Sequence, residues 1–541
     1  MAIPKLAMIP SGYKANKVYS VLPTDGSGDL DFARTTKATR VNSGGLIEEV
    51  AIGVPRLDYT DGSCPSLLLE PSSTNLITQS ESFANTYWNK SGASIQGDAS
   101  TAGAEKVTNG NFASSSDWTI VNSDTNATSA IANGYLKLKT NGIFTQAAQN
   151  MGLVVGKTYK FTYEILSSDG GNLGLVNSNN NTKLIPSSVG FHTIYFQPNN
   201  GTFALKRYSG ALDVQIDNVS VKEVSGFSAP SVDSPLGAFK LVEDTSVASN
   251  HRIDSQNFSV VASGSITISV ILKYDGREWV KVRDFTTNAY VFFNILDNSI
   301  GHTNLVNSSQ KIVDLGNGFK RVSFTYASTS TNAQVRIYLA SSGSEDGYTG
   351  DGTSGVYIFG AQVEQQSSAT SYIPTAGTTI SRTADSASKS GISSLINSSE
   401  GVLYVQISAF ANDLSWRGIQ LMKTGNVDNQ VNIGYNTETQ SILSQVRVGG
   451  SLQYNQSFTV SDITTSHKIA IRYATNDFKV YIDGVAVGTH ITSGVTFSAN
   501  FLDSIEFNFL FGNSNFNGNV KQLQVFKTAL TDAELTTLTT L

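Results

Sequence analysis

Apolar and polar residues alternate along much of this chain, with the period of two that is typical of β-strands with one buried face. One such pattern occurs twice, in the same order and about 130 residues apart. Residues 190–196 and 214–221 carry the first copy, and residues 318–324 and 356–363 carry the second. The repeat predicts two sandwich-like modules, and a third strand-rich block begins at residue 401.

The fold class that these patterns predict is all-β and multi-domain, with several β-sandwich (jelly-roll) modules. Residues 79–105 and 226–375 are interpreted as an outer sandwich, and residues 106–225 as a complete jelly roll inserted into it. Insertion into a surface loop adds little loop-closure entropy. Tandem placement with a long linker is the alternative.

Residues 1–78 and 376–398 lie outside the predicted sandwiches and differ from them in composition. Residues 1–78 hold six of the eleven prolines and only short apolar runs, so they predict an extended, loop-rich attachment segment that neighbouring domains or chains order. Residues 376–398 are rich in Ser and Thr and poor in large apolar groups, which favours a linker. Residues 399–541 form the last predicted sandwich.

Two local signals in this last block predict specific elements. Asp483-Gly484 separates two alternating runs and indicates a hairpin. Thr531 and Glu534 have the spacing of a capping box, so one short helix is expected near the end of the chain. Helices are expected to be scarce elsewhere.

The amino-acid composition and charge limit the kinds of molecule that this chain is expected to bind. The 541 residues suggest three or four domains. Charged residues make up 15%, below the roughly 25% of typical soluble proteins. The net charge of −6 is spread out without a dense Lys/Arg cluster, which argues against nucleic acid as a partner. A polar, weakly charged surface suits neutral ligands.

Neither membrane insertion nor disulfide bonding is expected. No stretch reaches 18 consecutive apolar residues, and Pro4 and Pro10 interrupt the start of the chain where a secretion signal would need an apolar core. Cys64 is the single cysteine, which excludes a disulfide within the chain. The expectation is a protein that is made in a cytoplasm and folds without forming disulfides.

Two segments resemble a family of bacteriophage virion proteins that includes tail-fibre, baseplate and head-decoration proteins. The first runs from Arg56-Leu57-Asp58-Tyr59 through Ser66-Leu67-Leu68-Leu69-Glu70-Pro71 to Leu76. The second comprises residues 351–364 and Thr370-Ser371-Tyr372-Ile373-Pro374-Thr375. The resemblance spans roughly 300 residues at both ends of the outer module. It implies a virion protein with carbohydrate-binding-like modules and leaves its part of the virion open.

The other two modules have resemblances of their own. The inserted block is similar to carbohydrate-binding jelly rolls through residues 109–112, Trp118 and residues 216–221. The last block resembles laminin-G or concanavalin-like sandwiches through residues 480–484 and its terminal strand and helix. Both folds bind glycans in many relatives and act as spacers in others, so the resemblance does not by itself establish binding.

The predicted glycan-binding residues lie in the last block. Sugar recognition needs a flat aromatic face beside amides or carboxylates. Trp416, Tyr435 and Tyr454 are predicted to form a stacking platform with Asn432 and Asn436; the alternative is that each residue fills the core or supports a loop. Trp118 and Trp279 lie within strand patterns and are expected in the cores.

Two calcium sites are predicted from carboxylates near glycines or at a module end, because Ca²⁺ takes oxygen ligands on flexible turns. One comprises Glu345, Asp346 and Asp351, and the other comprises Asp213 and Asp217. A solvated acidic loop is the alternative for the first. No other cofactor is expected.

No catalytic signature occurs in the sequence. The five histidines show no metal-ligand spacing, no GxSxG elbow is present, and Cys64 has no evident base partner. The Glu-x-Asp-x-x-Glu strand of many concanavalin-like hydrolases is also missing, although distant carboxylates can still meet in space.

The predicted function is therefore non-enzymatic: a virion fibre or spike that binds host-surface glycans and is held on the particle by residues 1–78. Such fibres act as symmetric oligomers, often trimers, in which multivalency strengthens weak sugar contacts. A capsid-decorating head fibre and a polysaccharide depolymerase are the alternatives.

Overall fold

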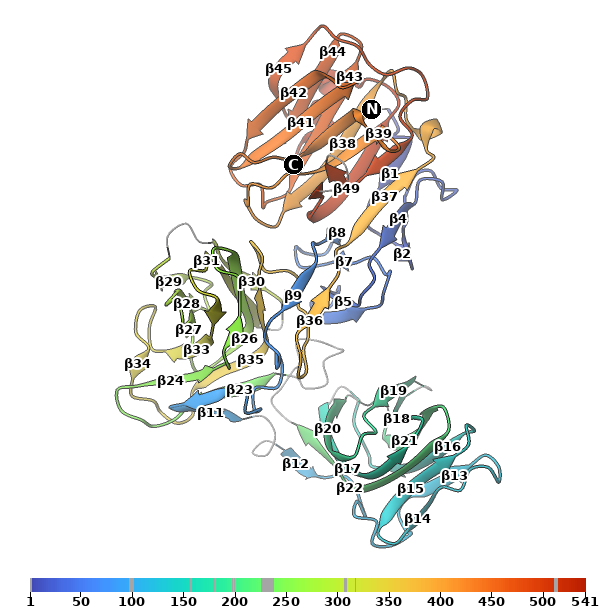
Figure 1. Ribbon diagram of the computed structural model, residues 1–541, viewed down its shortest axis with the longest axis vertical. Coiled ribbons are helices and arrows are strands. Elements are labelled where there is room, and N and C mark those ends of the chain that lie inside the picture. The colour runs from blue at the N-terminus through green and yellow to red at the C-terminus, as the bar shows by residue number, and fades with distance from the viewer. Residues whose placement is uncertain are drawn as a thin grey trace.

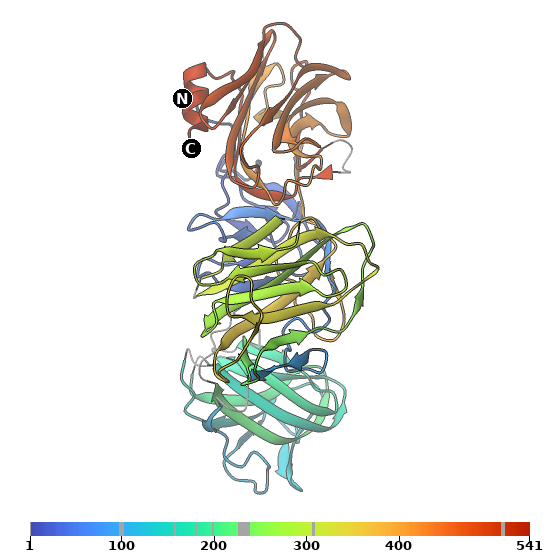
Figure 2. The ribbon, with the colours of Figure 1, turned by 90° about the vertical axis from the view of Figure 1, so that its left-hand side faces the viewer.

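The computed structural model describes residues 2–96, 102–155, 158–178, 181–196, 198, 200–224, 238–305, 309–316, 318–509 and 514–541. Three β-sandwiches follow one another along its long axis (Figures 1 and 2). One short helix, α1 (Asp532–Thr539), lies near the C-terminus. The predicted all-β, multi-sandwich fold class is confirmed. Among the described residues, no helix is long and apolar enough to cross a membrane.

The middle sandwich consists of a seven-stranded and a six-stranded sheet that enclose one apolar core. The seven-stranded sheet has the order β10 (Asn89–Ser91), β24 (Ser249–Asp254), β33 (Val335–Ala340), β27 (Trp279–Asp284), β28 (Tyr290–Asn294), β29 (Ile300–Thr303), with β34 (Gly347–Tyr348) beside β24. The six-stranded sheet has the order β11 (Ala93–Gln96), β23 (Phe239–Glu243), β35 (Gly355–Glu364), β26 (Ser265–Asp275), β31 (Phe319–Ala327), β30 (Ser309–Asp314). A short pair, β25 (Phe258–Ser259) and β32 (Asn332–Ala333), accompanies them.

A second sandwich lies in sequence between β11 and β23, which themselves pair with each other. Its first sheet has the order β14 (Ala130–Ala132), β15 (Tyr135–Thr140), β22 (Leu212–Val224), β17 (Thr158–Asp169), β20 (Gly190–Phe196), with β12 (Ala102–Glu105) beside β22. Its second sheet has the order β13 (Thr119–Asn122), β16 (Thr145–Asn150), β21 (Thr202–Ser209), β18 (Asn172–Ser178), β19 (Asn181–Ile185).

The limits of this inserted sandwich differ from the prediction at its start. Residues 102–105 were expected in the outer module, but β12 pairs with β22 and so belongs to the inserted sheet. The boundary expected at residues 225–226 lies outside the described residues. Trp118 lies in the core of this sandwich, as expected.

The repeated strand pattern takes equivalent places in the two sandwiches. In the inserted sandwich, β20 and β22 lie on either side of the long strand β17. In the middle sandwich, β31 and β35 lie on either side of β26. The sequence repeat therefore marks the two neighbours of one central strand in each module.

The C-terminal sandwich is built from both ends of the chain (Figure 1). Its eight-stranded sheet has the order β45 (Val485–Ile491), β44 (Asp477–Ile482), β43 (His467–Ala474), β38 (Glu400–Ala409), β49 (Gly518–Phe526), β8 (Ser66–Leu69), β7 (Leu57–Asp58), with β1 (Leu6–Met8) also paired to β49. Its nine-stranded sheet has the order β2 (Tyr13–Lys14), β3 (Lys17–Val18), β4 (Leu30–Ala33), β37 (Ser386–Ser390), β46 (Ser504–Glu506), β39 (Arg417–Lys423), β40 (Asn426–Tyr435), β41 (Ser441–Val448), β42 (Ser451–Thr459).

The proline-rich first segment is thus ordered mainly by the C-terminal sandwich. Its strands β1, β4, β7 and β8 extend both sheets, and a separate hairpin forms from β5 (Ala38–Val41) and β6 (Ile47–Val50). Leu6, Met8, Leu67 and Leu69 enter the C-terminal core. These contacts explain how a segment with short apolar runs gains order.

The prediction of a linker at residues 376–398 is wrong for its central part. β36 (Ile380–Arg382) pairs with β9 (Ser73–Asn75), and β37 pairs with β4 and β46. A 3₁₀ turn, Ser393–Leu395, follows. Polar strands need few large apolar groups when both edges are hydrogen-bonded, so composition alone was misleading here.

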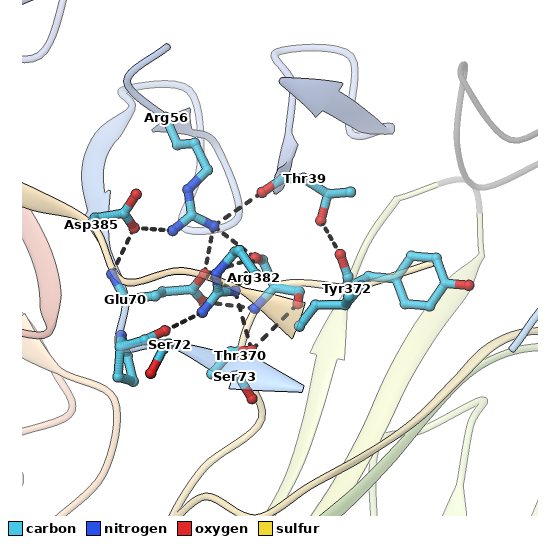
Figure 3. A network of polar contacts seen from close by, with 12 residues as sticks. Thr39, Arg56, Glu70, Ser72, Ser73, Thr370, Tyr372, Arg382 and Asp385 are labelled. Carbon is cyan, nitrogen blue, oxygen red and sulfur yellow. Dashed lines mark hydrogen bonds and ion pairs between the residues drawn. The ribbon is translucent and has the colours of Figure 1, made fainter. Parts of the chain in front are cut away.

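A buried ionic cluster joins this stretch to the first segment (Figure 3). The Glu70 carboxylate pairs with Arg56 Nη1 at 2.5 Å and with Arg382 Nη1 at 2.6 Å. Asp385 pairs with Arg56 and, at 3.2 Å, with Arg34 Nη1. Burial alone would raise the pKa of Glu70, but the charges of Arg382 and Arg56 lower it to about 2. The cluster therefore keeps the Glu70 carboxylate ionised.

The two local predictions for the last block are confirmed. Asp483-Gly484 connects β44 and β45 with positive φ at both residues. Thr531 caps α1, and the reciprocal hydrogen bonds between Thr531 and Glu534 complete the capping box.

Candidate functional site

The predicted aromatic platform is not assembled in the structure. Tyr435 and Tyr454 are buried in the C-terminal core, where the Tyr435 ring stacks on Phe516. Burial raises the pKa of both phenols. The prediction that these two rings are available for a sugar is wrong, because strand alternation places Tyr435 on the inner face of β40 with Val431 and Ile433.

The two predicted asparagines are also buried and do not join Trp416. Asn432 lies opposite Gln420 and Gln445 on the outer face of the nine-stranded sheet, with its amide packed over Gly418. Asn436 donates its amide hydrogen to Ser457 Oγ at 2.8 Å. Neither residue lines the cavity at Trp416, so only Trp416 remains of the predicted set.

Trp416 lines a cavity of about 340 Å³ at the edge of the C-terminal sandwich. Residues from three parts of the chain form it: the first segment, the stretch after β35 and the C-terminal sandwich. The lining residues are Pro71, Gln366, Ser367, Ser368, Phe410, Asp413, Ser415, Trp416, Arg417, Asn515 and Asn517. Most of them are polar, which suits a ligand with many hydroxyl groups.

One face of the Trp416 indole is covered by another aromatic ring. The indole stacks on Phe509 with 4.9 Å between ring centroids and 9° between ring planes. Phe509 belongs to a two-residue strand, β47 (Asn508–Phe509), which pairs with β48 (Ser514–Asn515). Trp416 is 39% exposed despite this contact. A sugar ring would therefore have to stack on the face that Phe509 leaves free.

The two charged residues that line the cavity, Arg417 and Asp413, form an ion pair. Arg417 binds Asp413 and also donates from Nη2 to the Ala411 carbonyl at 2.9 Å. Ser367 donates its hydroxyl hydrogen to Asp413 Oδ2 at 2.9 Å and so connects the two sandwiches at this point. Asp413 is the only carboxylate and Arg417 the only cation among the described lining residues. The pair makes the cavity electrically neutral.

Two polar atoms at the cavity lack a hydrogen-bond partner within the described residues. They are the amide oxygen of Asn517 and Nε of Arg417, both buried. A buried polar atom without a partner costs about 1–3 kcal/mol, so these two atoms are a local cost to the stability of the cavity wall. Sequence reasoning missed Asn515 and Asn517, although the alternation Asn515-Phe516-Asn517 around a core phenylalanine places both on the opposite face.

The carboxylates of the first predicted calcium site have protein partners. Asp346 accepts from Lys281 Nζ at 3.0 Å, and Glu345 accepts from the Gly347 amide at 3.1 Å. Hydrogen bonds from Ser354 and Thr353 lower the pKa of Asp351. These contacts describe a loop ordered by its own turns and by one lysine.

The second predicted calcium site is similar. Asp213 lies between Lys137 and Lys139, with N–O distances of 3.2 and 2.9 Å, and Asp217 accepts from the Asn218 amide at 2.7 Å. In the part of the chain that the structure describes, no three His, Cys, Asp or Glu side chains gather to hold a metal ion. The geometry therefore gives neither calcium prediction support.

The part of the chain that forms most of this cavity matches a known protein family. Residues 408–536 match the family model of the concanavalin A-like lectin/glucanases superfamily, and the match includes every cavity residue from Phe410 to Asn517. The matched stretch covers β39 to β49 and the start of α1. No curated protein matches the chain.

Several solved structures are similar to parts of the chain. A carbohydrate-binding module of the Ruminococcus gnavus IT-sialidase, bound to α2,3-sialyllactose, is 15% identical over 26% of this chain and 83% of its own, with a TM-score of 0.23. Domains LG4-5 of the mouse laminin α1 chain are 11% identical over 52% and 86%, with a TM-score of 0.18. The tandem CBM22 domain of Paenibacillus barcinonensis Xyn10C is 10% identical over 50% and 99%, with a TM-score of 0.19.

Proposed function

We propose that this protein binds a neutral saccharide in the cavity at Trp416 and leaves the saccharide chemically unchanged. The observation that carries the proposal is the exposed indole, backed by Phe509, beside the amides of Asn515 and Asn517. The indole supplies an apolar face for the sugar ring, and the amides supply donors and acceptors for its hydroxyls. The cavity volume lies within the roughly 300–1,000 Å³ of small-molecule sites.

The charge state of the cavity favours an uncharged ligand. Asp413 and Arg417 neutralise each other, and Ser367 and Ala411 hold them in place. A charged sugar would have to compete with this pair. A hydroxyl group can instead bind beside it without disturbing either charge.

A glycan array with the full chain tests the proposal. We expect binding to neutral oligosaccharides that weakens about fivefold or more in Trp416→Ala, because stacking of a sugar on an aromatic ring contributes on the order of 1 kcal/mol or more. Tyr208→Ala is the matched control, since Tyr208 is a similarly exposed aromatic residue in the inserted sandwich. No binding to any neutral glycan, or full binding by Trp416→Ala, would refute the site. Release of shorter sugars would identify a depolymerase instead.

The biological setting that we propose is a bacteriophage particle, with the protein as a tail fibre or spike. The support is the resemblance of residues 56–76 and 351–375 to virion proteins. These two segments meet at the buried cluster, where Glu70 accepts from the Ser371 amide at 2.6 Å. In this proposal residues 1–78 attach the protein to other virion proteins, and a capsid-decorating head fibre is the alternative. Antibody labelling of intact particles distinguishes tail from head, and absence of label would reject both.

A symmetric oligomer, such as a trimer, belongs to the same proposal. Several copies of a weak site on one particle would raise the effective affinity for a glycan-covered surface without new contacts. Sedimentation equilibrium of the purified chain measures the oligomeric state directly. A monomer at all concentrations would remove this part of the proposal and leave the cavity unaffected.

A further inference from the structure

The outer face of the seven-stranded sheet in the middle sandwich carries a dense set of cationic and aromatic side chains. Strand alternation sends Ile253, Val280, Val282 and Ile337 into the core. Their neighbours in sequence point to the opposite face: Arg252, Asp254, Lys281, Arg283, Tyr290, Phe292, Arg336 and Tyr338. Figure 2 shows this sheet turned toward the viewer with neither of the other two sandwiches in front of it. The other two sandwiches therefore leave this face uncovered, while Asp254, Lys281, Phe292 and Tyr338 are buried among their neighbours on it.

One row of this face crosses four strands in register. Arg252 lies opposite Tyr338, Tyr338 lies opposite Lys281, and Lys281 lies opposite Phe292. Lys281 Nζ is 4.5 Å from the ring centroid of Tyr290, 5.1 Å from that of Tyr338 and 5.2 Å from that of Phe292. Asp346 also binds Lys281, at 3.0 Å. This lysine is satisfied by its surroundings and supports the floor of the face.

The next row contains a cation with no carboxylate partner. Arg252 and Arg336 both reach Asp254, with N–O distances of 3.0 and 3.6 Å. Arg283 lies between Arg336 and Tyr290 in the register, and no carboxylate among the described residues pairs with it. Its Nε is buried and has no hydrogen-bond partner in the part of the chain that the structure describes. Because no described carboxylate pairs with Arg283, a carboxylate from outside would meet no competing ion pair there.

One exposed ring, that of Phe285, lies next to this arginine. The Arg283 guanidinium carbon is 5.2 Å from the ring centroid of Phe285, and that of Arg336 is 3.3 Å from it. Phe285 is 44% exposed, although it is a large apolar side chain. The Tyr290 hydroxyl is 3.0 Å from Nδ1 of His302, which adds polar groups at the rim. Cations, a flat apolar surface and hydroxyl-binding groups therefore meet in one place.

Trp279 borders the same face and not the core, so its predicted core position is wrong. Gly301 and Gly343 close on the indole: a Cβ atom on either glycine would come within 2.8 Å of it. Trp279 lies opposite Asn294 and Ala340, next to the Lys281 row. The two glycines fix the indole at one end of the face.

We propose that this face is a second saccharide site and that it binds a sugar bearing a carboxylate, of the uronic or sialic acid class. The ligand carboxylate pairs with the guanidiniums of Arg283 and Arg336, because planar guanidinium groups match a carboxylate in two parallel hydrogen bonds. The sugar ring packs on Phe285. Charge complementarity selects an acidic ligand here, whereas the neutral cavity at Trp416 does not, so the two sites are independent.

Calorimetric titration of the full chain with trigalacturonate and with α2,3-sialyllactose tests the site, and lactose serves as the neutral control. We expect at least one acidic probe to bind more tightly than lactose and to lose affinity as salt rises. Arg283→Gln is expected to weaken that binding about tenfold or more, because a charge-assisted hydrogen bond is lost. Arg283→Lys keeps the positive charge but cannot form the two parallel hydrogen bonds. Its affinity for the acidic sugar is expected to lie between that of the native protein and that of Arg283→Gln.

Three further variants separate this site from other causes. Phe285→Ala is expected to weaken acidic-sugar binding, while Trp416→Ala and Arg207→Gln, an arginine change in the inserted sandwich, are expected to leave it unchanged. Thermal melting of each variant shows whether it is folded. Failure of both acidic probes to bind, or equal binding by a folded Arg283→Gln protein, overturns the proposal. Equally tight binding of single-stranded DNA also overturns it, since the face would then attract polyanions in general.

Discussion

Leu67 lies opposite Val520 in adjacent antiparallel strands, so the first seventy residues supply a neighbour to the last long strand of the chain. Leu6 makes the same kind of pair with Val525 on β49. All four side chains belong to the core of the C-terminal sandwich. This sandwich therefore includes residues from both ends of the sequence.

We predict that a fragment of residues 399–541 alone does not fold. Without the first segment, β49 loses β8 and β1, and the core loses Leu6, Met8, Leu67 and Leu69. Removing one large buried aliphatic side chain typically destabilises a protein by about 2–5 kcal/mol, so losing four costs as much as the whole stability of a typical domain, about 5–15 kcal/mol. Near-ultraviolet circular dichroism of the fragment should lack the signal of packed aromatic rings.

The control is a fragment of residues 102–224. Every strand of the inserted sandwich pairs with another strand of the same module among the described residues, and the module has its own core. It should fold and unfold cooperatively by itself. A folded 399–541 fragment would show that the N-terminal strands are accessory.

Strand alternation was enough to predict the architecture but not the partners of the polar strands. Residues 318–324 and 356–363 each have a clear buried face, and both became central strands beside β26. Ser386–Ser390 has almost no apolar residues, yet it forms a strand because β4 and β46 hydrogen-bond to its two edges. Those partners are over a hundred residues away in sequence, and a local pattern carries no information about them.

The candidate site shows the same division. The alternation Val431, Ile433, Tyr435 already places the Tyr435 ring in the core, so the sequence alone is enough to separate Tyr435 from Trp416. Phe509 could not be placed behind Trp416 from the sequence, because that contact depends on how the β47–β48 hairpin packs on the sheet. The local sequence pattern shows which face of a strand a side chain occupies, but it does not show which distant residues pack against that side chain.

We predict that Glu70→Gln strongly destabilises the protein. The change removes the carboxylate that pairs with both Arg56 and Arg382, and the two guanidiniums stay buried. Removing one partner of a buried ion pair costs about 3–5 kcal/mol, because the remaining charge stays out of water. Urea unfolding, followed by tryptophan fluorescence, measures the change in the free energy of unfolding.

Glu49→Gln is the matched control for this substitution. Glu49 pairs with Lys37 at the surface, where the two side chains are 39% and 66% exposed. Exposed pairs contribute about 0–1 kcal/mol, so the free energy of unfolding should hardly change. Equal effects of the two substitutions would mean that the buried cluster contributes nothing beyond a surface pair.

The same carboxylate makes stability depend on pH in acid. Because the pKa of Glu70 is lowered from 4.5 to about 2 on folding, its contribution is complete above pH 4.5 and is lost as the pH falls toward 2. The difference in unfolding free energy between the native sequence and Glu70→Gln should therefore shrink across this interval. Urea titrations at several pH values measure it, and a constant difference would show that Glu70 titrates normally in the folded protein.

Tyr435→Phe is predicted to leave stability unchanged or raise it by about 1 kcal/mol. The Tyr435 hydroxyl is buried in the core and has no hydrogen-bond partner among the described residues, so its removal relieves the cost of taking a polar group out of water. Tyr473→Phe in the same core is the control, because the Tyr473 hydroxyl donates to the Asn397 carbonyl at 2.8 Å. That substitution should cost about 1 kcal/mol, since it leaves the carbonyl without its donor. The melting temperature of Tyr473→Phe should therefore fall below that of Tyr435→Phe. Equal destabilisation by the two substitutions would indicate that the Tyr435 hydroxyl has a partner such as bound water.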